Sequence, residues 1–111
     1  MLFRKKKTVN CTADVLFKIL AEDLADGLCT DIHFTIDGKK HRFGAWRDNG
    51  NTYKNVVFYF DEYECNSFEE LKKNAMLNNI RLIESKETIT VTECNGCYPE
   101  STPILQALME K

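Results

Sequence analysis

The chain of 111 residues carries fifteen basic and seventeen acidic side chains, for a net charge of −2, and 43% of its residues are hydrophobic. This length suits one compact domain with a single core. The near balance of charge excludes a generically basic nucleic-acid coat protein and a highly charged disordered tail, and two prolines and five glycines exclude collagen-like and low-complexity classes.

The start of the chain differs from the rest in charge. Four consecutive basic residues occupy positions 4–7, so residues 1–10 are interpreted as a basic, flexible N-terminal segment and residues 11–111 as one domain. No signal peptide is expected, and no apolar run reaches the ~18–20 residues that a membrane span requires. Five cysteines are an odd number that a closed set of disulfides cannot use, which indicates reduced thiols and predicts a cytoplasmic protein.

The first predicted element is a helix over residues 12–26. Thr12 is placed to cap its start, and Gly27 to supply the left-handed residue beyond its end. Apolar residues recur there at helical spacing and form one stripe: Val15, Leu16, Ile19, Leu20 and Leu24. The opposite side carries a charged residue at every fourth position, as expected of a surface that faces solvent.

Three strands are predicted next, over residues 31–36, 39–47 and 53–60. Asp37 and Gly38 form the first turn, because a two-residue turn of the first primed type needs positive φ at both positions. Residues 53–60 are rich in β-branched and aromatic side chains, so this strand is expected at the centre of the sheet. Short turns force neighbouring strands to run antiparallel, so the three strands form a meander.

An acidic connection, residues 61–66, separates the meander from a second predicted helix. Ser67 and Glu70 form a capping box at its start, in which the Ser67 hydroxyl accepts a hydrogen bond from the third amide and Glu70 reaches back. Asn78 and Asn79 are expected to end this helix.

The last third of the chain adds a strand and a helix. Residues 80–83 fit either a last helical turn or a short strand, whereas alternation over residues 86–93 predicts a strand with one solvent-facing side. Pro103 suits the first turn of a C-terminal helix, where its missing amide costs nothing. The predicted order is therefore α-β-β-β-α-β-α, an α+β fold with an antiparallel meander sheet of about four to five strands and helices packed on it.

Alternation sorts the meander into two faces. One is apolar and is expected to pack on the helices: Ile32, Phe34, Ile36, His41, Phe43, Ala45, Val56, Phe58 and Phe60. The other, the outer face, carries a mixed set: His33, Thr35, Lys40, Arg42, Trp46, Val57 and Tyr59. Residues 39–54 contain five basic residues and one acidic residue, so the outer face is expected to be cationic.

The outer face has three interpretations. Tryptophan, tyrosine and arginine are favoured anchors of protein interfaces, which predicts a binding site for a protein partner at His33, Lys40, Arg42, Trp46 and Tyr59. Basic residues interleaved with aromatic rings also suit a single-stranded nucleic-acid platform, although the net charge of −2 disfavours it. Alternatively, the C-terminal helix covers this face and Trp46 belongs to the core.

The sharpest local motif is Cys94-Asn95-Gly96-Cys97. Cys94 and Cys97 have the spacing that holds one side of a zinc ion, but tetrahedral zinc needs two further ligands. The same spacing is typical of a thiol-redox pair, although the rest of a thioredoxin-type fold is missing. The remaining interpretation is a surface turn with two reduced cysteines.

The sequence contains no glycine-rich phosphate loop and no combination of groups suited to catalysis. It predicts a small, cytoplasmic, non-enzymatic protein-interaction domain of the accessory, inhibitory or immunity type, with no cofactor and no membrane association. One alternative is a zinc-binding or thiol-redox protein centred on Cys94 and Cys97. The other is a single-stranded nucleic-acid-binding domain that uses the outer face.

Overall fold

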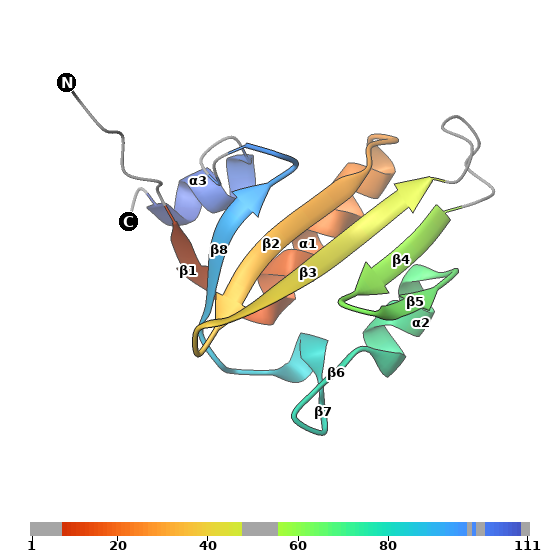
Figure 1. Ribbon diagram of the computed structural model, residues 1–111. Helices are drawn as coiled ribbons and strands as arrows, with labels where there is room; N and C mark the ends of the chain where they lie inside the picture. The colour runs from red at the N-terminus through yellow and green to blue at the C-terminus, as the bar shows by residue number, and fades with distance from the viewer. Residues whose placement is uncertain (1–7, 48–55, 98, 100–101, 110–111) are drawn as a thin grey trace.

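The computed structural model describes residues 8–47, 56–97, 99 and 102–109. The fold is α+β, as predicted, with an antiparallel sheet of six strands and helices packed against it (Figure 1). In chain order the elements are β1 (Val9–Cys11), α1 (Ala13–Ala25), β2 (Thr30–Ile36), β3 (Lys39–Arg47), β4 (Val56–Phe60), β5 (Tyr63–Cys65), α2 (Phe68–Asn74), β6 (Met76–Leu77), β7 (Ile80–Arg81), the 3-10 helix η1 (Leu82–Glu84), β8 (Ile89–Cys94) and α3 (Pro103–Met109). Within these residues, no helix is both long and apolar enough to span a lipid bilayer.

The main sheet has the strand order β1-β8-β2-β3-β4-β5, and each neighbouring pair is antiparallel. It exceeds the predicted four to five strands because a short strand lies at each edge. Strand β1 includes Val9 and Asn10, which the sequence assigned to the terminal segment. Strand β5 lies within residues 61–66, where only a connection was expected: Asp61 adopts a φ of 52°, which lets the chain turn back and pair with β4.

The expectation that the strand ending at Phe60 is central is wrong. Strand β4 lies beside the edge strand β5, whereas β2 lies between β8 and β3 near the middle. Strand β8 is distant in sequence and pairs with the far side of β2, which moves the centre of the sheet away from β4. The start of the predicted strand, residues 53–55, lies outside the described residues.

The second helix starts as predicted but ends earlier. The Ser67 hydroxyl accepts a hydrogen bond from the Glu70 amide at 3.0 Å, which caps α2. The expectation that Asn78 and Asn79 end this helix is wrong, because α2 stops at Asn74 and the two asparagines form the turn between β6 and β7. Their φ angles are 53° and 68°, a left-handed conformation that asparagine tolerates well.

The α-helices α1, α2 and α3 pack on the same face of the sheet (Figure 1). The inward residues of β2, including Ile32 and Phe34, are buried in one core with the apolar sides of α1 and α2. Leu105 of α3 joins this core, and the Thr102 hydroxyl donates a hydrogen bond to the buried Cys94 sulfur at 3.0 Å. The interpretation in which α3 covers the outer face is therefore wrong, and Trp46 is 44% exposed.

Candidate functional site

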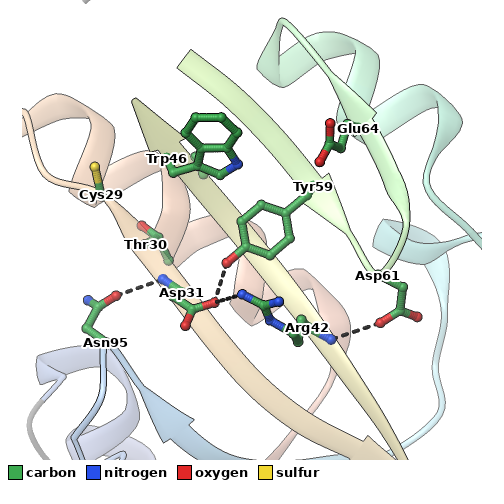
Figure 2. A pocket seen from close by; sticks show the side chains of 10 residues that line it. Cys29, Thr30, Asp31, Arg42, Trp46, Tyr59, Asp61, Glu64 and Asn95 are labelled. Carbon is green, nitrogen blue, oxygen red and sulfur yellow. Dashed lines mark hydrogen bonds and ion pairs between the residues drawn. The ribbon is translucent and has the colours of Figure 1, made fainter. Parts of the chain in front are cut away.

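A row of four residues crosses the outer face, one from each of four neighbouring strands; Asp31, Tyr59 and Glu64 of this row are labelled in Figure 2. In register, from β2 to β5, these are Asp31, Gly44, Tyr59 and Glu64. The Tyr59 hydroxyl reaches across β3 and donates a hydrogen bond to the Asp31 carboxylate. A Cβ on Gly44 would lie 3.0 Å from the Tyr59 hydroxyl oxygen and 2.0 Å from the carbonyl oxygen of Thr30. Because Gly44 leaves this space, Tyr59 is only 7% exposed on a face that no described helix covers.

Asp31 connects several polar groups of the outer face. It accepts from Tyr59, its Oδ2 lies 3.0 Å from His33 Nε2, and its Oδ1 lies 3.5 Å from the Arg42 guanidinium. Partial burial opposes ionisation of Asp31, but the hydrogen bonds from Tyr59 and His33 and the charges on His33 and Arg42 outweigh it. The pKa of Asp31 is therefore lowered.

The pKa of Tyr59 shifts in the opposite direction, upward. Burial of the ring and the hydrogen bond to the Asp31 carboxylate raise the pKa of Tyr59, and they outweigh the opposing charge of Arg42. The phenol therefore stays protonated and acts as a donor. The Arg42 guanidinium carbon lies 5.4 Å from the centre of the Tyr59 ring, in a cation–π position. Together these contacts fix the orientation of Arg42 on the outer face.

A second row lies next to the first and alternates in charge. His33 Nδ1 is 3.7 Å from Glu93 Oε2, and Arg42 is the register partner of His33 on β3. The Arg42 amide donates to Asp61 Oδ1 at 2.9 Å. The other Asp61 oxygen lies 2.7 Å from Nδ1 of His41, whose ring is stacked against the core as the alternation predicted.

Two hollows lie on either side of Arg42. The first has a volume of about 330 Å³ and is shown in Figure 2; its lining comprises Cys29, Thr30, Asp31, Arg42, Ala45, Trp46, Tyr59, Asp61, Glu64 and Asn95. The second has a volume of about 720 Å³; its lining comprises His33, Phe34, Thr35, Lys40, His41, Arg42, Asp61, Glu62, Thr92 and Glu93. Arg42 and Asp61 line both hollows, so the outer face is a grooved surface of mixed polar and apolar character.

The predicted partner-binding residues all lie on this surface. His33, Arg42 and Tyr59 are brought together by Asp31, Trp46 forms one wall of the first hollow, and Lys40 is exposed in the second. Their exposure differs, because Tyr59 fills the space above a glycine while Trp46 and Arg42 face solvent. Whether these residues bind a partner stays a prediction.

Sequence reasoning missed the carboxylates of the outer face. Asp31 alternates in phase with His33 and was identifiable from the sequence alone. Glu93, Glu64 and Asp61 reach this face only through the order β8-β2-β3-β4-β5, which the sequence does not reveal. The expectation of a cationic outer face is therefore wrong for the described residues, since these four carboxylates accompany two cations, Lys40 and Arg42.

The cysteine motif forms a tight turn at the end of β8. Asn95 and Gly96 have φ angles of 54° and 77°, and the amides and carbonyls of Cys94 and Cys97 pair at 2.9 and 3.0 Å. The Asn95 side chain accepts from the Asp31 amide at 2.7 Å, and the Asn95 amide donates to the Asp31 carbonyl at 2.7 Å. The turn therefore fastens the end of β8 to the start of β2.

The two thiols of this turn lie in different surroundings. Cys94 is buried in the core, where burial raises the pKa of its thiol in spite of the hydrogen bond from Thr102, whereas Cys97 is exposed. Among the described residues, no group of three His, Cys, Asp or Glu side chains is arranged to hold a metal ion. Zinc binding by Cys94 and Cys97 stays a prediction.

No protein-family model, curated protein or solved structure matches this chain.

Proposed function

We propose that this chain is a protein-interaction domain that binds a protein partner through the outer face of its sheet. The observation that carries the proposal is the placement of Trp46 and Arg42, which are both exposed on a grooved sheet face that none of the described helices covers. Tryptophan and arginine are the residue types most enriched among the energetic anchors of protein interfaces. An exposed indole and an exposed guanidinium on the same uncovered face are therefore better explained by a partner than by the stability of the free chain.

The polar groups of the outer face are held in place before any partner arrives. The Asp31 carboxylate accepts hydrogen bonds from Tyr59 and His33 and forms an ion pair with Arg42. The Asp31 amide donates a hydrogen bond to the Asn95 side chain. A surface whose side chains are already ordered loses less conformational entropy on binding, which favours affinity.

The same engagement of polar groups is the reason to propose a non-enzymatic role. Both ring nitrogens of His33 face carboxylates, and the Tyr59 hydroxyl is engaged with Asp31 and has a raised pKa. Cys94 is buried and its raised pKa disfavours the thiolate that redox chemistry requires. The proposal also places the chain in a reducing compartment such as the cytosol, since the five cysteines are free thiols.

The carboxylates favour a protein partner over a nucleic acid. A phosphate backbone meeting the outer face would approach four carboxylates, from Asp31, Asp61, Glu64 and Glu93. Arg42, a cation of this face, is already paired with Asp31. Nucleic-acid platforms instead require cations that are free to follow the phosphates.

The experiment compares two double variants in partner capture. Trp46→Ser with Arg42→Ala removes the exposed anchors, whereas Met76→Ser with Arg81→Ala removes an apolar and a cationic side chain of matching exposure from the β6–β7 hairpin; Met76 is 49% exposed. Immobilised full-length chains are incubated with extract of the source cells, and retained proteins are quantified by mass spectrometry. We expect the wild type and the hairpin variant to retain equal amounts of a partner protein. The outer-face variant should retain at least about tenfold less of it. Equal retention by both variants would refute it.

A further inference from the structure

The residues that line the first hollow of the outer face are suited to binding a planar cation. Trp46 of β3 and Tyr59 of β4 provide aromatic walls, and Glu64 of β5 lies beside Tyr59 in register (Figure 2). The volume of about 330 Å³ lies at the lower end of the range for ligand pockets, which suits one side chain rather than a whole cofactor. Asp31 and Asp61 line the side of the hollow beyond the Tyr59 ring.

The three carboxylates of the hollow differ in how far they are engaged. Asp31 is bound by Tyr59, His33 and Arg42, and Asp61 is bound by His41 and by the Arg42 amide. Among the residues whose side chains the structure describes, none forms an ion pair with Glu64. Of the three carboxylates of the hollow, Glu64 is therefore the one that no described cation engages.

The charged residues that line the hollow favour a positively charged occupant over a negatively charged one. Three carboxylates surround it against one guanidinium, that of Arg42, which Asp31 already partly neutralises. An anion entering the hollow would meet an excess of negative charge. A cation would gain from Glu64 and from the faces of the aromatic rings at the same time.

Resting on the proposed function, we infer that this hollow is the socket for an arginine side chain of the protein partner. Arginine fits better than lysine because its flat, weakly hydrated guanidinium stacks on an indole while it donates two parallel hydrogen bonds to a carboxylate. Trp46 provides the stacking surface and Glu64 the acceptor. A partner segment with an exposed arginine on an otherwise neutral or basic surface is the chemistry that complements the outer face.

The test uses the full-length chain and defined small probes. N-acetyl-arginine methylamide is titrated into ¹⁵N-labelled protein, with the citrulline analogue as an uncharged isostere and the lysine analogue as a compact cation. The chain has one tryptophan, so its single indole N–H signal reports on the wall formed by Trp46. The inference expects a shift of this signal with millimolar affinity for the arginine probe, and affinity weaker by about fivefold or more for the other two.

Two variants separate the contribution of the Glu64 carboxylate from general surface charge. Glu64→Gln is expected to weaken binding of the arginine probe by about two- to fivefold, whereas Glu84→Gln, an exposed carboxylate on η1, leaves it unchanged. Equal shifts with the arginine and citrulline probes, no shift at all, or stronger binding of inorganic phosphate would each overturn the inference. If the probe fails while Trp46→Ser with Arg42→Ala still abolishes capture of the partner, the arginine socket is wrong and the proposed function stands; failure of both experiments removes both.

Discussion

The hydroxyl of Tyr59 donates a hydrogen bond to the carboxylate of Asp31 across an intervening strand of the sheet. The two side chains can reach each other only because the residue between them, Gly44, has no side chain. It keeps the large ring of Tyr59 flat on the outer face and gives Arg42 both a carboxylate partner and an aromatic surface. This hydrogen bond is therefore one of the contacts that order the proposed interface.

Replacing the Tyr59 hydroxyl tests this contact. Tyr59→Phe should lower the free energy of unfolding by about 1 kcal/mol, less than a fully buried charged hydrogen bond contributes, because water can reach Asp31. Urea unfolding of Tyr59→Phe, Asp31→Asn and the double variant measures the coupling between the two groups. Strictly additive losses in the double variant would show that the two side chains do not interact in solution.

The pH dependence of stability should report on Asp31. Its pKa in the folded chain lies below the ordinary value of about 4, so its ionised form stabilises the fold fully above that value. As the pH falls through the folded pKa, protonation removes this contribution. The difference in free energy of unfolding between the wild type and Asp31→Asn should therefore shrink as the pH falls from about 5 to 3. Urea unfolding across this range, with Asp26→Asn as a control for loss of a surface carboxylate, checks this; a constant difference would contradict it.

A methyl group at Gly44 should be poorly tolerated. Its Cβ would lie 2.0 Å from the Thr30 carbonyl oxygen, so the backbone of β2 or β3 must move, at a cost of about 3 kcal/mol. Gly38→Ala, in the turn of the same hairpin, meets no atom within 4 Å and costs only about 1 kcal/mol because of its φ of 79°. Thermal unfolding of both variants checks that Gly44→Ala loses more stability than Gly38→Ala. Equal losses would show that the backbone at Gly44 moves at little cost.

The five thiols should fall into two classes of reactivity. Cys29 and Cys97 are exposed and should react quickly with a thiol reagent at neutral pH. Cys65 and Cys94 are buried, and the pKa of Cys11 is raised to about 11 by burial and by the charge of Asp14. These three should react at least about tenfold more slowly until the chain is unfolded. Mass spectrometry of the time course identifies each thiol, and a fast reaction at Cys94 would favour the thiol-redox alternative instead.

The parts of the fold that depend on local pattern were predictable. Helix α1, the β2–β3 hairpin with its Asp37-Gly38 turn, and the Ser67 cap follow from apolar spacing, turn chemistry and capping, which act over a few residues. Asn78 and Asn79 were misassigned because asparagine serves helix ends and two-residue turns alike, and only the pairing of β6 with β7 decides between them.

The candidate site was only half predictable, for a related reason. Alternation placed His33, Arg42 and Trp46 on one face, since each strand carries that information in its own sequence. Glu93 and Glu64 come from β8 and β5, whose places in the sheet follow from long-range pairing. The sign of charge on the outer face therefore could not be derived without the strand order.

The fluorescence of the single tryptophan offers the most direct test of the proposal that the outer face binds the partner. Trp46 is 44% exposed in the free chain, so acrylamide should quench its emission efficiently. With a captured partner that lacks tryptophan, or one labelled to make its tryptophan silent, the quenching constant should fall by about half or more, as the indole becomes buried in the interface. An unchanged quenching constant in the saturated complex would contradict the account and place the interface elsewhere on the molecule.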